Sequence, residues 1–451
     1  MNNEKNLTQG NILYSLLGFA LPVLLALFLQ SLYGGADLLI VGHFSDTADV
    51  SGVATGSMLM QTITMVITGL SVGITVLVAR KTGEGKNSDA GRTIGSGICL
   101  FGVFAVILTI VLGFFSDIAA QILHAPPEAF SSTSSYIKVC GLGCIFIIAY
   151  NLLGAVFRGL GDSRTPLITV CIACFLNIAG DLIFAGLLNL GAFGAALATV
   201  ISQGVSVFIS LVIISRRPLS FEMKKEYVRF DSEIIRSELK LGIPIGLQEM
   251  LVGMSFLLIQ TIINSINVTA SAGVGVAEKV CGFIMLVPSS YMQSMAAFVA
   301  QNKGAGKHDR AVRALLCGIG TSLIVGVIMA SFTFFHGDIL AHIFSKDTQV
   351  IQAAHEYLKA YAIDTISTSI LFCMIGYFNG CGNTVFVMLQ GIVGAIGVRV
   401  PAAFVFSRLR HTTLFLIGLS TPVATVVQIT MCVIFYMYMK KKTSLQSVKI
   451  N

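Results

Sequence analysis

Long apolar segments constrain this chain more than any other feature. Twelve such runs separate short polar stretches along its 451 residues. A helix of about twenty residues crosses the hydrocarbon of a bilayer, whereas a tilted β-strand needs only about ten. Because a bilayer offers no partner to unpaired backbone groups, only helix bundles and closed barrels can cross it. The length of the runs therefore predicts transmembrane helices.

Composition excludes the main soluble alternatives. Charged residues make up 11% of the chain and hydrophobic residues 55%, whereas a soluble domain carries about 25% charged residues. So few charges cannot cover the water-facing surface of a chain this long. A soluble enzyme, a disordered protein and a nucleic-acid-binding protein are thereby excluded, despite the formal net charge of +7. We expect the lipid bilayer to be the main partner of this chain.

The apolar runs and the polar breaks between them predict twelve spans. Their approximate limits are 12–41, 50–79, 93–116, 132–157, 165–187, 193–215, 240–266, 271–300, 311–335, 350–379, 384–407 and 411–438. The first run is too long for the apolar part of a signal peptide and lacks a small-residue cleavage site before it ends. We therefore interpret it as an uncleaved first span.

Lysine and arginine residues predict the orientation of these spans. With the N-terminus inside, 22 basic residues lie in inside segments, and only Lys346, Arg408 and Arg410 lie in outside segments. Basic residues concentrate in the cytoplasmic loops of membrane proteins. Both termini are therefore predicted to be cytoplasmic, and we expect a multi-pass protein of the plasma (inner) membrane.

An internal repeat divides the chain into two halves. Residues 79–92 align with 300–313 at an offset of 221, and the same offset pairs a Phe-x-Gly-x-Gly motif at 157–161 with one at 378–382. Each half contains six of the predicted spans. Because six is even, both halves enter the membrane from the same side, which makes them parallel repeats about an axis along the membrane normal.

We therefore predict an all-α integral membrane protein with twelve transmembrane helices in two six-helix lobes related by this parallel repeat. The N-terminal lobe takes residues 1–215, a cytoplasmic inter-lobe linker 216–239, and the C-terminal lobe 240–451, which ends in a short basic cytoplasmic tail. At the end of the linker, 231–241 is predicted to form a short interfacial amphipathic helix. Two rigid bundles on a flexible join favour alternating access, with a substrate site between them near mid-membrane.

Two loops end like a phosphate-binding loop but lack its other residues. Gly304–Lys307 has Gln301 where the motif needs its first glycine, and neither this loop nor Gly83–Lys86 has Ser or Thr after its lysine. We interpret both as loops that join helices. We expect no nucleotide, no other cofactor and no enzymatic activity, so that a gradient of H⁺ or Na⁺ is the expected energy source.

Charged side chains inside the spans are costly in hydrocarbon and therefore mark candidate functional sites. Asp37 lies in the outer part of the first span and Asp181 in the outer part of the fifth. Asn177 precedes Asp181 by four residues and shares its helix face. Because the depths of the two acids match, they can converge within the N-terminal lobe. Such a pair can hold a shared proton, or bind Na⁺ together with Asn and Thr oxygens; no other metal is expected.

The second half lacks these acids. At an offset of 221–222 it carries Leu258 or Ile259 in place of Asp37, and Ala402 in place of Asp181. A scaffold residue should be symmetric between repeats, whereas a cation site can lie in one lobe only. A structural explanation stays open, in which each Asp lies near the membrane surface or caps a kink beside a glycine.

Other charged residues lie inside the spans of the second half. Glu249, Glu278, Asp364 and Arg399 are less regularly placed than the acids of the first half. They either line the cavity of the C-terminal lobe or form bridges between helices. The sequence leaves both possibilities open.

Motifs along nearly the whole chain resemble the multidrug and toxic compound extrusion (MATE) family. They are Leu21-Pro22, Leu32-Tyr33, Asp37 and Val41-Gly42 in the first span, the segment Ala79–Lys86 with Ala90 after the second, Arg158–Asp162 with Thr165-Pro166 after the fourth, and Arg399-Val-Pro401 in the eleventh. The resemblance implies twelve helices in two lobes. It also implies export of drugs and other organic molecules in exchange for H⁺ or Na⁺.

The resemblance extends to a cation site. In the branch similar to DinF proteins, which we favour, this site uses an Asp, an Asn-x-x-x-Asp pair and a Thr of spans one, five and six. The matching residues here are Asp37, Asn177, Asp181 and Thr199, with Asn151 as a span-four Asn of the same network. In the NorM-like branch, carboxylates of spans seven and ten also take part. Glu249 lies about one turn before the expected position and Asp364 aligns only loosely, which leaves a C-terminal ion site open.

The sequence thus predicts a secondary antiporter that exports small organic compounds, cationic or amphipathic in character, in exchange for H⁺ or Na⁺. Three alternatives differ in their requirements. A flippase of lipid-linked saccharides predicts extra spans and a cationic cavity, and a narrow-specificity metabolite exporter would use the same scaffold. A membrane-embedded enzyme would need clustered His or carboxylates, whereas the seven histidines are scattered along the chain.

Overall fold

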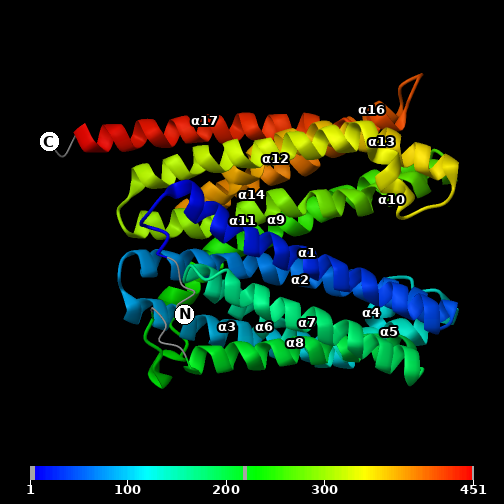
Figure 1. The fold of residues 1–451 in the computed structure, drawn as a ribbon, viewed down its shortest axis with the longest axis horizontal. Coiled ribbons are helices and arrows are strands. Elements are labelled where there is room, and N and C mark those ends of the chain that lie inside the picture. The colour runs from blue at the N-terminus through cyan, green and yellow to red at the C-terminus, as the bar shows by residue number, and fades with distance from the viewer. Residues whose placement is uncertain (1–5, 217–220, 449–451) are drawn as a thin grey trace. The chain divides into compact units, whose positions relative to one another are not determined.

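The computed structural model describes residues 6–216 and 221–448, and the side chains as far as Lys442. Lys5, Arg217 and Lys449, which contribute to the predicted basic count, lie outside this part. Within the described residues every regular element is helical (Figure 1). In residues 6–216 and 221–448, eleven helices are long and apolar enough to cross a membrane, and one bent pair raises the number to twelve if it counts as one span. The all-α prediction is confirmed.

The helices of the first half follow the predicted spans closely. They are α1 (Ile12–Phe44), α2 (Thr47–Gly83), α3 (Asn87–Phe114), α4 (Ser116–Ile122), the short helix η1 (Pro127–Ala129), α5 (Phe130–Leu142), α6 (Cys144–Gly159), α7 (Arg164–Asp181), the π-helix η2 (Leu182–Leu187) and α8 (Gly191–Arg216).

The rest of the chain is helical in the same way, with its breaks in other spans. It contains the short helix η3 (Lys225–Tyr227), then α9 (Ser232–Asn264), α10 (Val268–Ile284), α11 (Leu286–Gly304), α12 (His308–His342), α13 (Thr348–Cys381), α14 (Thr384–Ile392), the π-helix η4 (Val393–Arg399), α15 (Val400–Ser407), α16 (Leu414–Gly418) and α17 (Ser420–Val448). The break between α10 and α11 has a local cause. Pro288 cannot donate to the carbonyl group four residues earlier, at Ile284.

The fourth predicted span differs from a simple helix. The segment 132–157 falls on α5 and α6, which meet at an angle of 55°. Gly143 lies at the bend, and a side chain there would collide with Val200 of α8. The bend therefore depends on a close approach between helices, which hydrophobicity alone does not encode.

Two pairs of helix-joining turns show the repeat in the backbone. Gly85 and Gly306, 221 residues apart, both have φ of +71°. Gly161 and Gly382, again 221 residues apart, have φ of +85° and +83°. A left-handed backbone suits glycine because it lacks a Cβ atom. The lysine-containing loops are therefore tight turns between helices, as predicted, and their glycines serve the turn.

Packing divides the chain into two compact units. The first extends to Gly246 and includes Ala296–Ala311, and the second takes Leu247–Met295 and the chain from Val312 onwards. This division cuts α9, α11 and α12 within their length. The predicted lobe limits, 1–215 and 240–451, follow the sequence repeat instead and stay a prediction.

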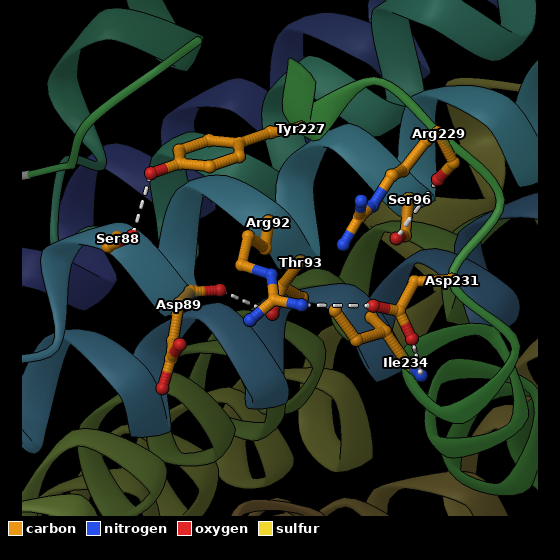
Figure 2. A network of polar contacts seen from close by, with 9 residues as sticks. All are labelled: Ser88, Asp89, Arg92, Thr93, Ser96, Tyr227, Arg229, Asp231 and Ile234. Carbon is orange, nitrogen blue, oxygen red and sulfur yellow. Dashed lines mark hydrogen bonds and ion pairs between the residues drawn. The ribbon is translucent and has the colours of Figure 1, made fainter.

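The predicted flexible linker is attached to α3 where the structure describes it. Arg92 of α3 lies 3.4 Å from Oδ2 of Asp231, and the Ser88 hydroxyl lies 2.7 Å from the Tyr227 hydroxyl. Figure 2 shows these contacts along one side of α3. We call residues 221–231 the docked segment. It belongs to the first unit and is not a free join.

Glycines let the docked segment lie directly against α3. A side chain at Gly91 would collide with the carbonyl oxygen of Glu222, and one at Gly95 with that of Tyr227. After the docked segment, α9 runs from Ser232 to Asn264 without a break. The prediction of a separate interfacial helix at 231–241 is therefore wrong. Its amphipathic pattern is the first part of a long helix that packs on α2.

A second segment is held in the same manner. The Arg310 guanidinium donates to the carbonyl oxygens of Leu7, Gln9 and Gly10 at 3.3, 2.7 and 2.7 Å. Asn302 also donates to Leu7 at 3.2 Å. The chain before α1 thus binds the start of α12, while the chain before α9 binds the start of α3. Both sets of contacts lie within the first unit.

Candidate functional site

Four polar side chains of the first unit meet in what we call the acidic cluster. Its members are Asp37 on α1, Asn177 and Asp181 on α7, and Thr199 on α8. Nδ2 of Asn177 donates to Oγ1 of Thr199 at 3.3 Å, and Oγ1 of Thr199 donates to Oδ2 of Asp37 at 3.4 Å. Asp181 lies near enough for its carboxyl group to interact with that of Asp37. The structure thus brings together four of the five residues predicted for the cation site, Thr199 among them from the resemblance.

Close helix packing positions the cluster. A side chain at Gly180 would approach Cβ of Ala198 to 2.8 Å, so this glycine allows α7 to lie against α8. Thr199 is the residue after Ala198, so this close packing brings its side chain to Asn177. After Asp181 the helix continues as the π-helix η2. Such a widened turn is frequent at functional sites.

Burial makes the cluster a candidate cation site. Asp37 is 5% exposed, and Asn177 and Asp181 are fully buried. Among the described residues, no donor reaches Oδ1 of Asp37, Oδ1 of Asn177 or either carboxylate oxygen of Asp181. Two neighbouring buried carboxylates require a compensating positive charge. A shared proton or a Na⁺ ion held by these oxygens would supply it.

Tyr33 and Gln203 also adjoin the acidic cluster. The sequence predictions did not include these two residues. The Tyr33 hydroxyl hydrogen-bonds the Gln203 side chain and lies within range of the charge of Asp37. Tyr33 precedes Asp37 by four residues and therefore lies on the same face of α1. The same four-residue spacing joins Thr199 to Gln203 on α8. This spacing was the signal that could have found them.

Asn151 has its hydrogen bonds elsewhere. Its Oδ1 accepts from the Thr68 hydroxyl at 3.2 Å, and its Nδ2 donates to the Ile147 carbonyl at 2.8 Å. The first of these bonds joins α6 to α2, the second stays within α6, and neither reaches the acidic cluster. The resemblance predicted Asn151 as a member of the cation network, but the structure places it in a helix-bridging contact.

The candidate residues of the second half have varied surroundings. Asp364 is buried and accepts from the hydroxyls of Thr368 at 3.0 Å and Thr425 at 2.6 Å. Glu249 is half-buried. Glu278 is also half-buried, and its Oε1 has no hydrogen-bond partner among the described residues. Of the three acids, only Asp364 has a built polar environment.

Glu238 is a buried acid that the sequence did not reveal. It is 2% exposed, and neither carboxylate oxygen has a hydrogen-bond partner within the described parts of the chain. It lies on α9 beside Gly97 of α3, whose missing side chain would approach its Oε1 to 3.5 Å. The carboxyl therefore lies beside space that Gly97 of the neighbouring helix leaves open.

Two repeated helix bundles of membrane-spanning length, with buried polar groups inside, are an architecture found among membrane transporters. The family model described as MatE matches residues 22–183 and again residues 244–405. The chain belongs to the MatE family. Because the second match repeats the first at an offset of 222, it confirms the parallel internal repeat and the resemblance noted in the sequence.

Curated relatives cover most of the chain. The probable multidrug resistance protein YpnP of Bacillus subtilis is 25% identical over 405 residues, which is 89% of this chain and 89% of that protein. The probable multidrug resistance protein NorM of Thermotoga maritima is 27% identical over 395 residues, covering 86% and 84%. The DinF-like branch stays a prediction.

Solved structures share the fold over nearly the full length. The crystal structure of MATE in complex with MaL6 has a TM-score of 0.92 at 18% identity, covering 98% of this chain and 100% of the other. A transporter of the MOP superfamily from Pyrococcus furiosus has a TM-score of 0.91 at 19% identity, covering 98% of both chains. That protein is described as having a binding pocket of reverse polarity. At these identities the likeness shows the fold alone.

Proposed function

We propose that this protein is a secondary antiporter that exports small organic compounds, cationic or amphipathic in character, in exchange for H⁺ or Na⁺. The observation that carries the proposal is the acidic cluster, with its two buried carboxylates and three side-chain types that can ligate a cation. The export of drugs is supported by relatives that are named multidrug resistance proteins. We place the termini on the cytoplasmic side from the distribution of basic residues.

The cluster couples ion and substrate by mutual exclusion. A cation enters between Asp37 and Asp181, while Thr199 and Asn177 hold the Asp37 carboxylate in position. A ligand shifts a conformational equilibrium only through its different affinity for the two states. Cation binding on α1 therefore favours the state with weak substrate affinity, and release of the cation restores the other.

Efflux of ethidium tests the proposal. Cells that express wild type, Asp37→Asn or Asp181→Asn are loaded with ethidium, and the proton and sodium gradients are collapsed one at a time. Efflux should fail in both variants and under one collapsed gradient, which names the ion. Asp338→Asn is the matched control because Asp338 is exposed on α12. Normal export by the cluster variants at wild-type protein levels would contradict the mechanism.

A narrower cargo is the second candidate. The Pyrococcus furiosus transporter with reverse pocket polarity has this same fold, so the fold does not fix the substrate. If wild type does not export ethidium, lipid-linked saccharides and anionic metabolites are tested next with the same variants. If Asp37→Asn abolishes the transport of these compounds, the proposed coupling site is retained and only the proposed substrate class changes.

A further inference from the structure

The turn between α11 and α12 packs with the first unit, although most of both helices belongs to the second. Residues Ala296–Ala311 are part of the first unit, and the chain on either side of them is part of the second. We call Ala296–Ala311 the hairpin tip. Whatever binds the hairpin tip therefore restrains α11 and α12 at the point where both helices leave the second unit.

Close backbone contacts hold the hairpin tip against the end of α2. A side chain at Gly304 would collide with the Arg80 carbonyl oxygen, and one at Gly83 would collide with that of Gln301. The two contacts are counterparts in the repeat, because both the two glycines and the two carbonyl residues are 221 positions apart. Gln301 also donates to the Gly159 carbonyl at the end of α6, at 3.0 Å. The hairpin tip thus fits the first unit without space for a side chain at either glycine.

The chain before α1 is bound by the hairpin tip. All four carbonyl oxygens of Leu7–Gly10, which we call the strap, accept hydrogen bonds from side chains of the tip. Arg310 supplies the donors for three of them, and Lys307 donates to the fourth, that of Thr8, at 2.8 Å. The Leu7 side chain is fully buried. A segment whose successive carbonyl groups all bond to one turn is attached to that turn.

We propose that the strap is a latch that keeps the hairpin tip in the first unit and releases it once in each transport cycle. The inference rests on the proposed function, since alternating access requires the two repeats to move relative to each other. The strap leads directly into α1, which carries Asp37. A movement of α1 on cation binding therefore reaches the hairpin tip through one continuous segment.

The chemistry of the contact suits a latch that opens and closes. Lys307 is exposed and Arg310 is half-buried, so water can replace the carbonyl groups as their acceptors when the strap leaves. Both donors keep their charge outside the contact, and the strap contributes only neutral carbonyl groups. Release therefore leaves no charge buried without a partner. It does expose Leu7, which makes this side chain a reporter of the open latch.

Cysteine labelling measures the opening of the strap. Leu7→Cys places a thiol at a buried position, and Thr8→Cys provides a second reporter at a half-buried one if the first variant does not fold. A water-soluble maleimide is added to the full-length protein in inside-out membrane vesicles, and the protein without the added cysteine gives the background from native thiols. Arg310→Gln should raise the labelling rate about tenfold or more. Tenfold corresponds to about 1.4 kcal/mol, which is within the contribution of one charged hydrogen bond. Arg313→Gln is the matched control, because Arg313 is exposed on the same helix.

A latch also predicts labelling that depends on transport. With Arg310 intact, the reporter should react faster while ethidium is exported under the ion gradient, and return to its resting rate when the gradient is collapsed. Equal rates in the two conditions would show a fixed anchor, and an unchanged rate in Arg310→Gln would show that this residue does not hold the strap. Either result would overturn the inference. If Asp37→Asn exports normally, the coupling proposal fails, whereas labelling that rises during export still supports the latch.

Discussion

The Thr199 hydroxyl donates to Oδ2 of Asp37 at 3.4 Å and so joins α8 to α1 across 162 residues of sequence. The same hydroxyl accepts from Asn177. One oxygen atom therefore orders side chains from three helices around a buried carboxylate. The position of Asp37 depends on a residue that carries no charge and that hydrophobicity does not reveal.

Removal of the Thr199 hydroxyl oxygen should weaken the binding of the coupling ion. Thr199→Val keeps the shape of the side chain but loses the hydrogen bond, which is worth about 1 kcal/mol or roughly fivefold in apparent ion affinity. Thr199→Ser should stay near wild type. Efflux measured over a series of ion concentrations checks the shift. Asn151→Ala serves as the comparison because the hydrogen bonds of Asn151 go to Thr68 and Ile147 and not to the cluster. An equal shift in that variant would argue against a special role of Thr199.

The close packing of α7 on α8 provides the next prediction. Gly180→Val would force its side chain into Ala198, at an expected cost of about 1–3 kcal/mol for overpacking. The acidic cluster should open and ion coupling should fall with it. Gly102→Val on α3 is the control, because nothing lies within 4 Å of a Cβ atom there. Melting temperatures of the two purified variants measure the difference, and equal values would refute the packing argument.

The docked segment should depend on glycine contacts more than on charge. Arg92 and Asp231 are 40% and 19% exposed, so their pair is worth about 0.2–1 kcal/mol. Gly95→Leu instead places a large side chain against the Tyr227 carbonyl and should displace the segment. We expect limited proteolysis within residues 221–231 to speed up strongly in Gly95→Leu and little in Arg92→Gln. The reverse order would show that the ion pair holds the segment.

The sequence predicted the parts of this fold that hydrophobicity controls. Apolar runs gave the helices, and the four-residue spacing of Asn177 and Asp181 indicated one shared face. The bend at Gly143 was not predictable, since it depends on contact with Val200 of a distant helix. The docked segment belongs to the basic stretch whose length between the two halves predicts a flexible join, and its contacts with α3 have no signal in that pattern. Asn151 is a candidate from the resemblance alone, and its hydrogen bond with Thr68 of α2 has no sequence signal.

Glu238 yields the last prediction, and it follows from comparing the two halves. Leu16 lies six residues before the first family match and Glu238 six residues before the second, and both side chains are buried. A buried carboxyl without a partner destabilises a fold, whereas a leucine of similar size gains from burial. Glu238→Leu should therefore raise the melting temperature by an amount equivalent to about 1–3 kcal/mol. Glu233→Leu is the control, since Glu233 is exposed in the first turn of the same helix.

If Glu238→Leu melts higher but exports less, the carboxyl is retained for transport at a cost in stability. If it melts lower than wild type, the carboxyl has a stabilising partner and the comparison with Leu16 does not hold.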